Sequence, residues 1–67
     1  MRQFEIGDMI KYPVFYKGFN VKQEGMIASE RKGKVLGDCS VDYGYEVLNE
    51  SNNNIWVWEY EIEEVGS

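Results

Sequence analysis

The sequence predicts a small all-β domain of five short strands that close into a barrel. Three observations lead to this fold class: large apolar residues recur at every second position, turn-forming residues separate the apolar runs, and 67 residues allow one modest core. The chain is 43% hydrophobic and 15% aromatic, which is typical of a sequence that folds. We therefore expect one domain over residues 1–67, with its core in about residues 7–65.

The first strand is expected at residues 8–16, where apolar side chains alternate after a turn at Gly7-Asp8. Pro13 has no N–H, so the strand either lies at a sheet edge there or leaves the sheet for a loop. The polar segment that follows has a glycine near each end, which predicts a long loop and irregular structure to about residue 31. A short second strand is expected within residues 33–37, before a turn over residues 38–42.

The clearest local pattern is a β-hairpin over residues 43–58. Its first strand alternates apolar and acidic side chains, which is typical of one buried face and one exposed face. The Asn-rich run at residues 51–54 suits the turn, because asparagine tolerates left-handed backbone conformations. After a tight turn, a short last strand is expected to carry Ile62 and Val65 into the core.

Three short motifs follow one another along the chain: Gly7-Asp8, Lys32-Gly33-Lys34-Val35, and the ending Glu59, Glu61 and Ile62. Their order resembles that of the SH3-like barrels, a group that includes KOW-type domains and small barrels encoded by phages and prophages. The resemblance covers about residues 7–65. It implies a small five-stranded SH3-like barrel with a long first loop. Members of this group bind peptides, nucleic acids or small ligands, so the resemblance implies binding and names no partner.

The second strand of the predicted hairpin can bury only one of two side-chain pairs, because alternate residues point to opposite faces of a strand. The resemblance favours Ile55 and Val57 on the core side, which places Trp56 and Trp58 outward as a binding platform. The opposite register, with both tryptophans in the core, stays open. The platform would be bordered by Glu46, Leu48 and Glu59.

The expected first loop is a second candidate surface. Phe15, Tyr16 and Phe19 lie there among Lys17 and Lys22. These aromatic residues either contact a partner or form a lid over one end of the barrel.

Charge is distributed unevenly along the chain. All seven cations fall within residues 1–34, whereas eight of the twelve acids fall within residues 35–67. The acidic half is either a solubility feature or a face that attracts a basic partner. The net charge of −5 argues against nucleic acid, because affinity for phosphates comes largely from cations.

The available side chains argue against an enzyme. The chain has no histidine, the commonest general base and metal ligand. Its one cysteine, Cys39, has acidic sequence neighbours and cannot form an internal disulfide, as expected in a reducing cytoplasm. Asp38, Ser40 and Asp42 match only part of a calcium-binding loop, so we expect no metal or cofactor. We also expect no membrane segment.

We therefore expect a small acidic, non-enzymatic, cytoplasmic binding module. A protein-interaction domain with a basic partner is favoured, and its most specific form is a phage-encoded antagonist of a host protein. The alternative is a small-ligand or nucleic-acid binder that combines aromatic residues with cations of the first half of the chain. Those cations are Lys17, Lys22, Arg31, Lys32 and Lys34.

Overall fold

The first two strands form one continuous hairpin in the structure, a computed structural model that describes residues 4–65. Strand β1 (Met9–Tyr16) pairs with β2 (Phe19–Ile27) along its whole length. Only Lys17 and Gly18 form the turn, and both have positive φ, at 48° and 83°. This is the geometry of a two-residue type I′ turn, which matches the natural twist of a hairpin. The first strand is confirmed, but the long irregular loop to residue 31 is wrong.

The central strand is β4 (Val41–Asn49), which pairs along both edges. Val47 pairs with Ile27 of β2 on one edge and with Ile55 of β5 (Asn54–Trp58) on the other. Strand β3 (Lys32–Val35) pairs with the same edge of β4 as β2 does. The other edge of β4 is occupied by β5, because Gly44 pairs with Lys32 on one side and with Trp58 on the other. The hairpin expected at residues 43–58 is confirmed.

Strands β2 and β3 are separated by a short break in which a side chain replaces the backbone as hydrogen-bond acceptor. The Ser29 Oγ atom accepts the N–H of Glu46 at 2.9 Å and donates to the carbonyl of Glu30 at 2.9 Å. Ser29 is buried, so these bonds satisfy a hydroxyl that would otherwise destabilise the core. The chain can therefore change direction here and leave β3 as part of a separate arm.

The chain ends beside its first strand. A 3₁₀ turn, η1 (Glu59–Glu61), leads into β6 (Glu63–Glu64), which pairs with Ile10 and Lys11 of β1. Because β6 stops there, Pro13 lies on an otherwise unpaired edge, one of the two placements expected for it. Ile62 packs against the core as expected. Val65 is partly exposed and is not among the side chains that pack there, so its expected role in the core is wrong.

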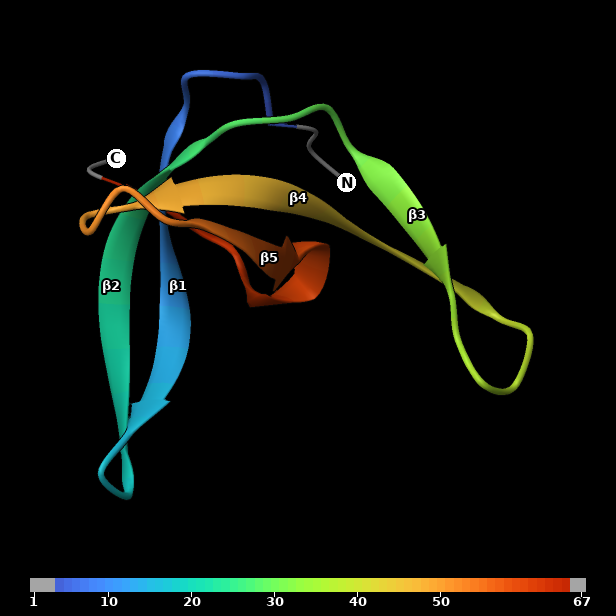
Figure 1. The fold of residues 1–67 in the computed structure, drawn as a ribbon, viewed down its shortest axis with the longest axis horizontal. Coiled ribbons are helices and arrows are strands. Elements are labelled where there is room, and N and C mark those ends of the chain that lie inside the picture. The colour runs from blue at the N-terminus through green and yellow to red at the C-terminus, as the bar shows by residue number, and fades with distance from the viewer. Residues whose placement is uncertain (1–3, 66–67) are drawn as a thin grey trace.

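Curling of the antiparallel sheet gives a half-barrel (Figure 1). The expected all-β class is confirmed. The β1–β2 hairpin and the β3–β4 hairpin extend from the junction as two arms that point in different directions, with β5 and η1 between them (Figure 1). No helix among residues 4–65 is long and apolar enough to cross a membrane. The buried core consists of Ile10, Tyr12, Ile27, Tyr45, Val47 and Val57, with Phe4, Val14, Ile55 and Ile62 packed against it.

Candidate functional site

Three aromatic side chains gather at the end of the β1–β2 hairpin. Phe15, Tyr16 and Phe19 are 74%, 59% and 72% exposed. Tyr16 and Phe19 are opposite one another across the turn and therefore share a face, whereas Phe15 points to the other face. The Lys17 ammonium lies 5.4 Å from the centre of the Tyr16 ring. We call Phe15, Tyr16 and Phe19 the aromatic tip; in this structure it is displayed to solvent and does not cover the core.

The two tryptophans of β5 lie on the side of the sheet away from the core. Val57 is buried and Ile55 packs against the core, which is the register that the sequence favoured. Trp56 and Trp58 face outward as expected but are half-buried, and their role as a binding platform stays a prediction. The Trp56 ring covers Gly44, where an added Cβ would come within 2.6 Å of the ring. Gly44, which is opposite Trp58 in the register, thus makes room for the neighbouring Trp56 indole.

The tryptophans belong to a row of three rings. Trp56 meets Trp58 edge to face with centroids 5.5 Å apart, and Trp58 stacks on Tyr60 at 6.3 Å. The Lys34 ammonium lies 4.0 Å from the centre of the Trp56 ring. Tyr60 in η1 is the most exposed of the three rings, and the sequence interpretation missed it. The spacing of two residues from Trp56 through Trp58 to Tyr60 was the available signal.

Cations from the first half of the chain pair with acids from the second half. Lys32 contacts Glu46 at 3.2 Å, and Arg31 binds both carboxylate oxygens of Glu59 at 2.5 and 3.1 Å. The hydrogen bond to Glu59 is the main reason that the pKa of Arg31 is raised. Glu46 was expected to border the tryptophans together with Glu59, and it is opposite Trp56 across the sheet. The charges of both acids are compensated within the chain.

Other predicted residues are dispersed. Leu48 is opposite Met26 on one side and Asn54 on the other, so it lies on the outward face diagonal to Trp56 and next to Met26. Cys39 is exposed, with a free thiol, in the turn between β3 and β4. In that turn the Asp38 carboxylate accepts the N–H and O–H of Ser40, which lowers its pKa. Among residues 4–65, no group of three His, Cys, Asp or Glu side chains is placed to hold a metal ion.

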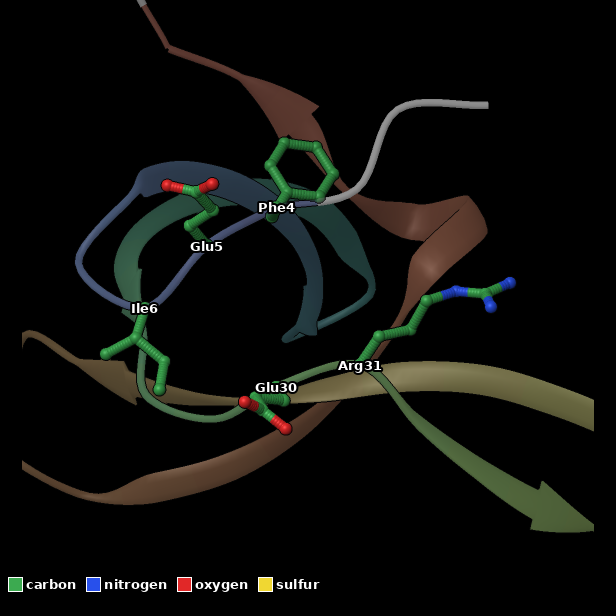
Figure 2. Close-up of a pocket in the computed structure, with 5 residues that line it drawn as sticks. All are labelled: Phe4, Glu5, Ile6, Glu30 and Arg31. Atoms are coloured by element: carbon green, nitrogen blue, oxygen red, sulfur yellow. The ribbon is translucent and has the colours of Figure 1, made fainter.

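An open hollow of about 400 Å³ lies where the start of the chain meets the break between β2 and β3. It is lined by Phe4, Glu5, Ile6, Glu30 and Arg31 (Figure 2). The Arg31 side chain extends away from the hollow, as Figure 2 shows, toward Glu59 and the Tyr43 ring, 3.7 Å from its guanidinium carbon. Among the described residues, the charged groups left at the hollow are the carboxylates of Glu5 and Glu30, which do not suit an anionic ligand.

Comparison of the chain with protein-family models, with curated proteins and with solved structures found no match. The chain is therefore classified by its fold alone, as a small all-β half-barrel of antiparallel strands.

Proposed function

We propose that this chain is a small, non-enzymatic module with an SH3-like fold that binds a protein partner through the aromatic tip. The observation that carries the proposal is the exposure of all three rings, between 59% and 74%. Aromatic side chains are enriched among the residues that dominate binding energy at protein interfaces. Tyr16 and Phe19 share one face of the hairpin and Phe15 lies on the other, so the proposed partner contacts both faces of the tip. Large exposed apolar groups on a small soluble domain commonly mark such an interface.

The backbone beneath the tip suits this role. The two-residue turn and the full pairing of β1 with β2 hold the rings on a short, ordered hairpin, so binding would cost less conformational entropy than ordering a loose loop. Each aromatic side chain can bury about 150–250 Å². Val21, which is also exposed on this hairpin, extends the apolar area toward the core.

Two features support the finer SH3-like assignment. The sheet curls into a half-barrel of antiparallel strands, and the last strand returns to pair with the first. Both features are compatible with the sequence motifs described above. Within the proposal, the most specific role is that of a phage-encoded antagonist acting on a host protein in the cytoplasm.

The alternative, binding of nucleic acid or a small anionic ligand, has less support. Lys22, Arg31 and Lys32 are each paired with a carboxylate, and Lys34 lies over the Trp56 ring. Binding of phosphate would have to displace these internal partners. A protein partner needs no such rearrangement at the aromatic tip.

The proposal is tested by capture on a surface to which the protein is coupled through Cys39. This thiol is exposed and lies in the other arm, so coupling leaves the tip free. The double variant Phe15→Ser/Phe19→Ser should bind the partner recovered by wild-type protein at least tenfold more weakly, because two anchor rings are lost. Its denaturation midpoint should be unchanged, since both rings are exposed.

A matched control is the double variant Val35→Ser/Val41→Ser, which removes two exposed apolar side chains from the other arm. It should bind like wild type. Equal binding by wild type and the tip variant would overturn the proposal. Binding to lipid vesicles in place of protein, lost in the tip variant, would assign the tip to a membrane surface.

A further inference from the structure

Three apolar side chains form a row on the outer face of the sheet. Met9 is opposite Met26, and Met26 is opposite Leu48, so the row crosses β1, β2 and β4. Their neighbours along the chain are buried in the core, which places the row on the outward face. Met9 and Met26 are 52% and 37% exposed. We call Met9, Met26 and Leu48 the methionine row. Core-facing neighbours that fix its orientation are Ile10, Ile27 and Val47.

The methionine row interrupts a polar surface. Alternate outward positions on the same three strands are Lys11, Glu24 and Glu46. Under the usual pattern of a sheet with one buried face, the positions of the row would also be polar. An apolar row at these outward positions is therefore a candidate contact surface for a partner.

The row surrounds a shallow hollow of about 220 Å³. This is smaller than the roughly 300–1,000 Å³ typical of sites for drug-sized ligands, and it suits one large side chain. Methionine adapts its shape to different apolar partners, because its chain is unbranched and its sulfur is polarisable. The hollow is lined by Met9, Glu24, Gly25, Met26, Leu48, Asn49 and Glu50.

Two carboxylates at the hollow form no ion pair within residues 4–65. Glu24 and Glu50 make no ion pair there, unlike Glu46, Glu59 and Glu63. Glu24 is opposite Lys11 across the sheet, whereas none of the described strand pairings places a cation opposite Glu50. An apolar hollow bordered by two carboxylates that form no ion pair is complementary to an apolar side chain flanked by cations. The same charges disfavour an acidic segment.

We propose that the methionine row binds a leucine, methionine or phenylalanine of a cationic protein segment, whose lysine or arginine side chains pair with Glu24 and Glu50. This surface is separate from the aromatic tip. Met9 is seven residues from Tyr16 along β1, or about 23 Å at the rise of a strand. The inference does not rest on the function proposed for the tip, and it gives the domain a second contact surface.

The test follows the methionine methyl groups by NMR in full-length protein labelled with ¹³C-methyl methionine. The probe is a synthetic helical peptide of leucine and lysine, compared with a peptide in which glutamate replaces every lysine. The lysine peptide should shift the Met9 and Met26 methyl signals in a saturable way. The glutamate peptide should leave them unchanged.

Two variants locate the interaction. Leu48→Ser should remove the saturable shift of the Met9 signal, and Glu24→Gln/Glu50→Gln should raise the dissociation constant about threefold to tenfold, as expected for two surface charge pairs. The charge variant changes no apolar contact, so it tests the proposal even if Leu48→Ser impairs folding. Glu30→Gln, an exposed acid outside this hollow, is the control and should bind like wild type.

Equal shifts with both peptides, or an unchanged dissociation constant in the charge variant, would overturn the inference. Phe15→Ser/Phe19→Ser should keep the methionine shifts. If that tip variant loses them, the peptide is bound at the aromatic tip and the methionine row is not its site. Failure of the tip proposal, which is measured by partner capture, is thus distinguishable from failure here.

Discussion

Gly44 determines how Trp56 lies on the outer face of the sheet. A Cβ at this position would come within 2.6 Å of both the Trp56 ring and the Val57 carbonyl oxygen. The indole therefore covers bare backbone, and its Nε1 atom is buried with no hydrogen-bond partner in the structure. This one residue explains why two large rings can be away from the core and yet half-buried.

Gly44→Ala should lower the free energy of unfolding by about 1–3 kcal/mol, the usual cost of forcing an extra carbon into a packed site. Denaturant unfolding followed by tryptophan fluorescence measures this. Gly37→Ala is the matched control, because a Cβ there meets nothing within 4 Å, and its stability should be close to that of wild type. A Gly44→Ala variant as stable as wild type would contradict the packing of Trp56 over this glycine.

The β1–β2 hairpin is the element on which the proposed function depends. Its turn needs positive φ at both Lys17 and Gly18, and lysine is poorly suited to that conformation. Phe15, Tyr16 and Phe19 are next to this turn, so the turn fixes their spacing. The same element shows where the sequence interpretation failed.

Lys17→Asn should stabilise the protein by about 0.5 kcal/mol, because Asn-Gly is the preferred pair in a type I′ turn. Gly18→Ala should destabilise it by about 1 kcal/mol, since φ is 83° there. Thermal or denaturant unfolding of the two variants checks both signs. Two changes of the same sign would argue against this turn type.

Local sequence signals predicted some elements and obscured others. The β4–β5 hairpin could be predicted because alternation and an Asn-rich turn occur together in it. Strand β2 could not, because Gln23 and Gly25 occupy positions on its core-facing side and its outward side is mostly polar. Strand β2 is instead stabilised by its pairing with β1, which the local sequence does not reveal. The aromatic tip was named from sequence, but as part of a loop.

Contacts between distant parts of the chain explain the remaining differences. Alternation alone left two choices for Trp56 and Trp58, and the position of Gly44 opposite β5 accounts for the one observed. The methionine row joins three strands, so it becomes visible only when their register is known. The ion pairs that neutralise Glu46 and Glu59 likewise depend on how β3 and η1 are placed.

At the scale of the whole molecule, three ion pairs within residues 4–65 join the basic first half of the chain to the acidic second half. Lys22 meets Glu63 at 2.9 Å where both side chains are about half exposed, whereas Arg31 and Glu59 have side chains that are 31% and 10% exposed. Exposed pairs contribute little to stability because water and salt screen them. A better shielded, bidentate pair contributes more.

Glu59→Gln should therefore lower the melting temperature more than Glu63→Gln does. Both variants remove one negative charge, so a difference between them reflects the burial and geometry of each ion pair and not the change in net charge. Thermal unfolding at low and high salt measures the difference, and salt should affect the Lys22 pair more strongly. Equal melting temperatures for the two variants would show that the Arg31–Glu59 pair stabilises the protein no more than the Lys22–Glu63 pair does.

Photo-crosslinking at the aromatic tip tests most directly whether this half-barrel is a protein-binding module. Phe19 is replaced by p-benzoylphenylalanine in protein produced in its own cells, and Val35, which is 74% exposed on the other arm, is replaced in a control. The proposed function predicts one discrete covalent protein adduct from position 19 and none from position 35. No adduct from position 19, or the same adducts from both positions, would contradict it.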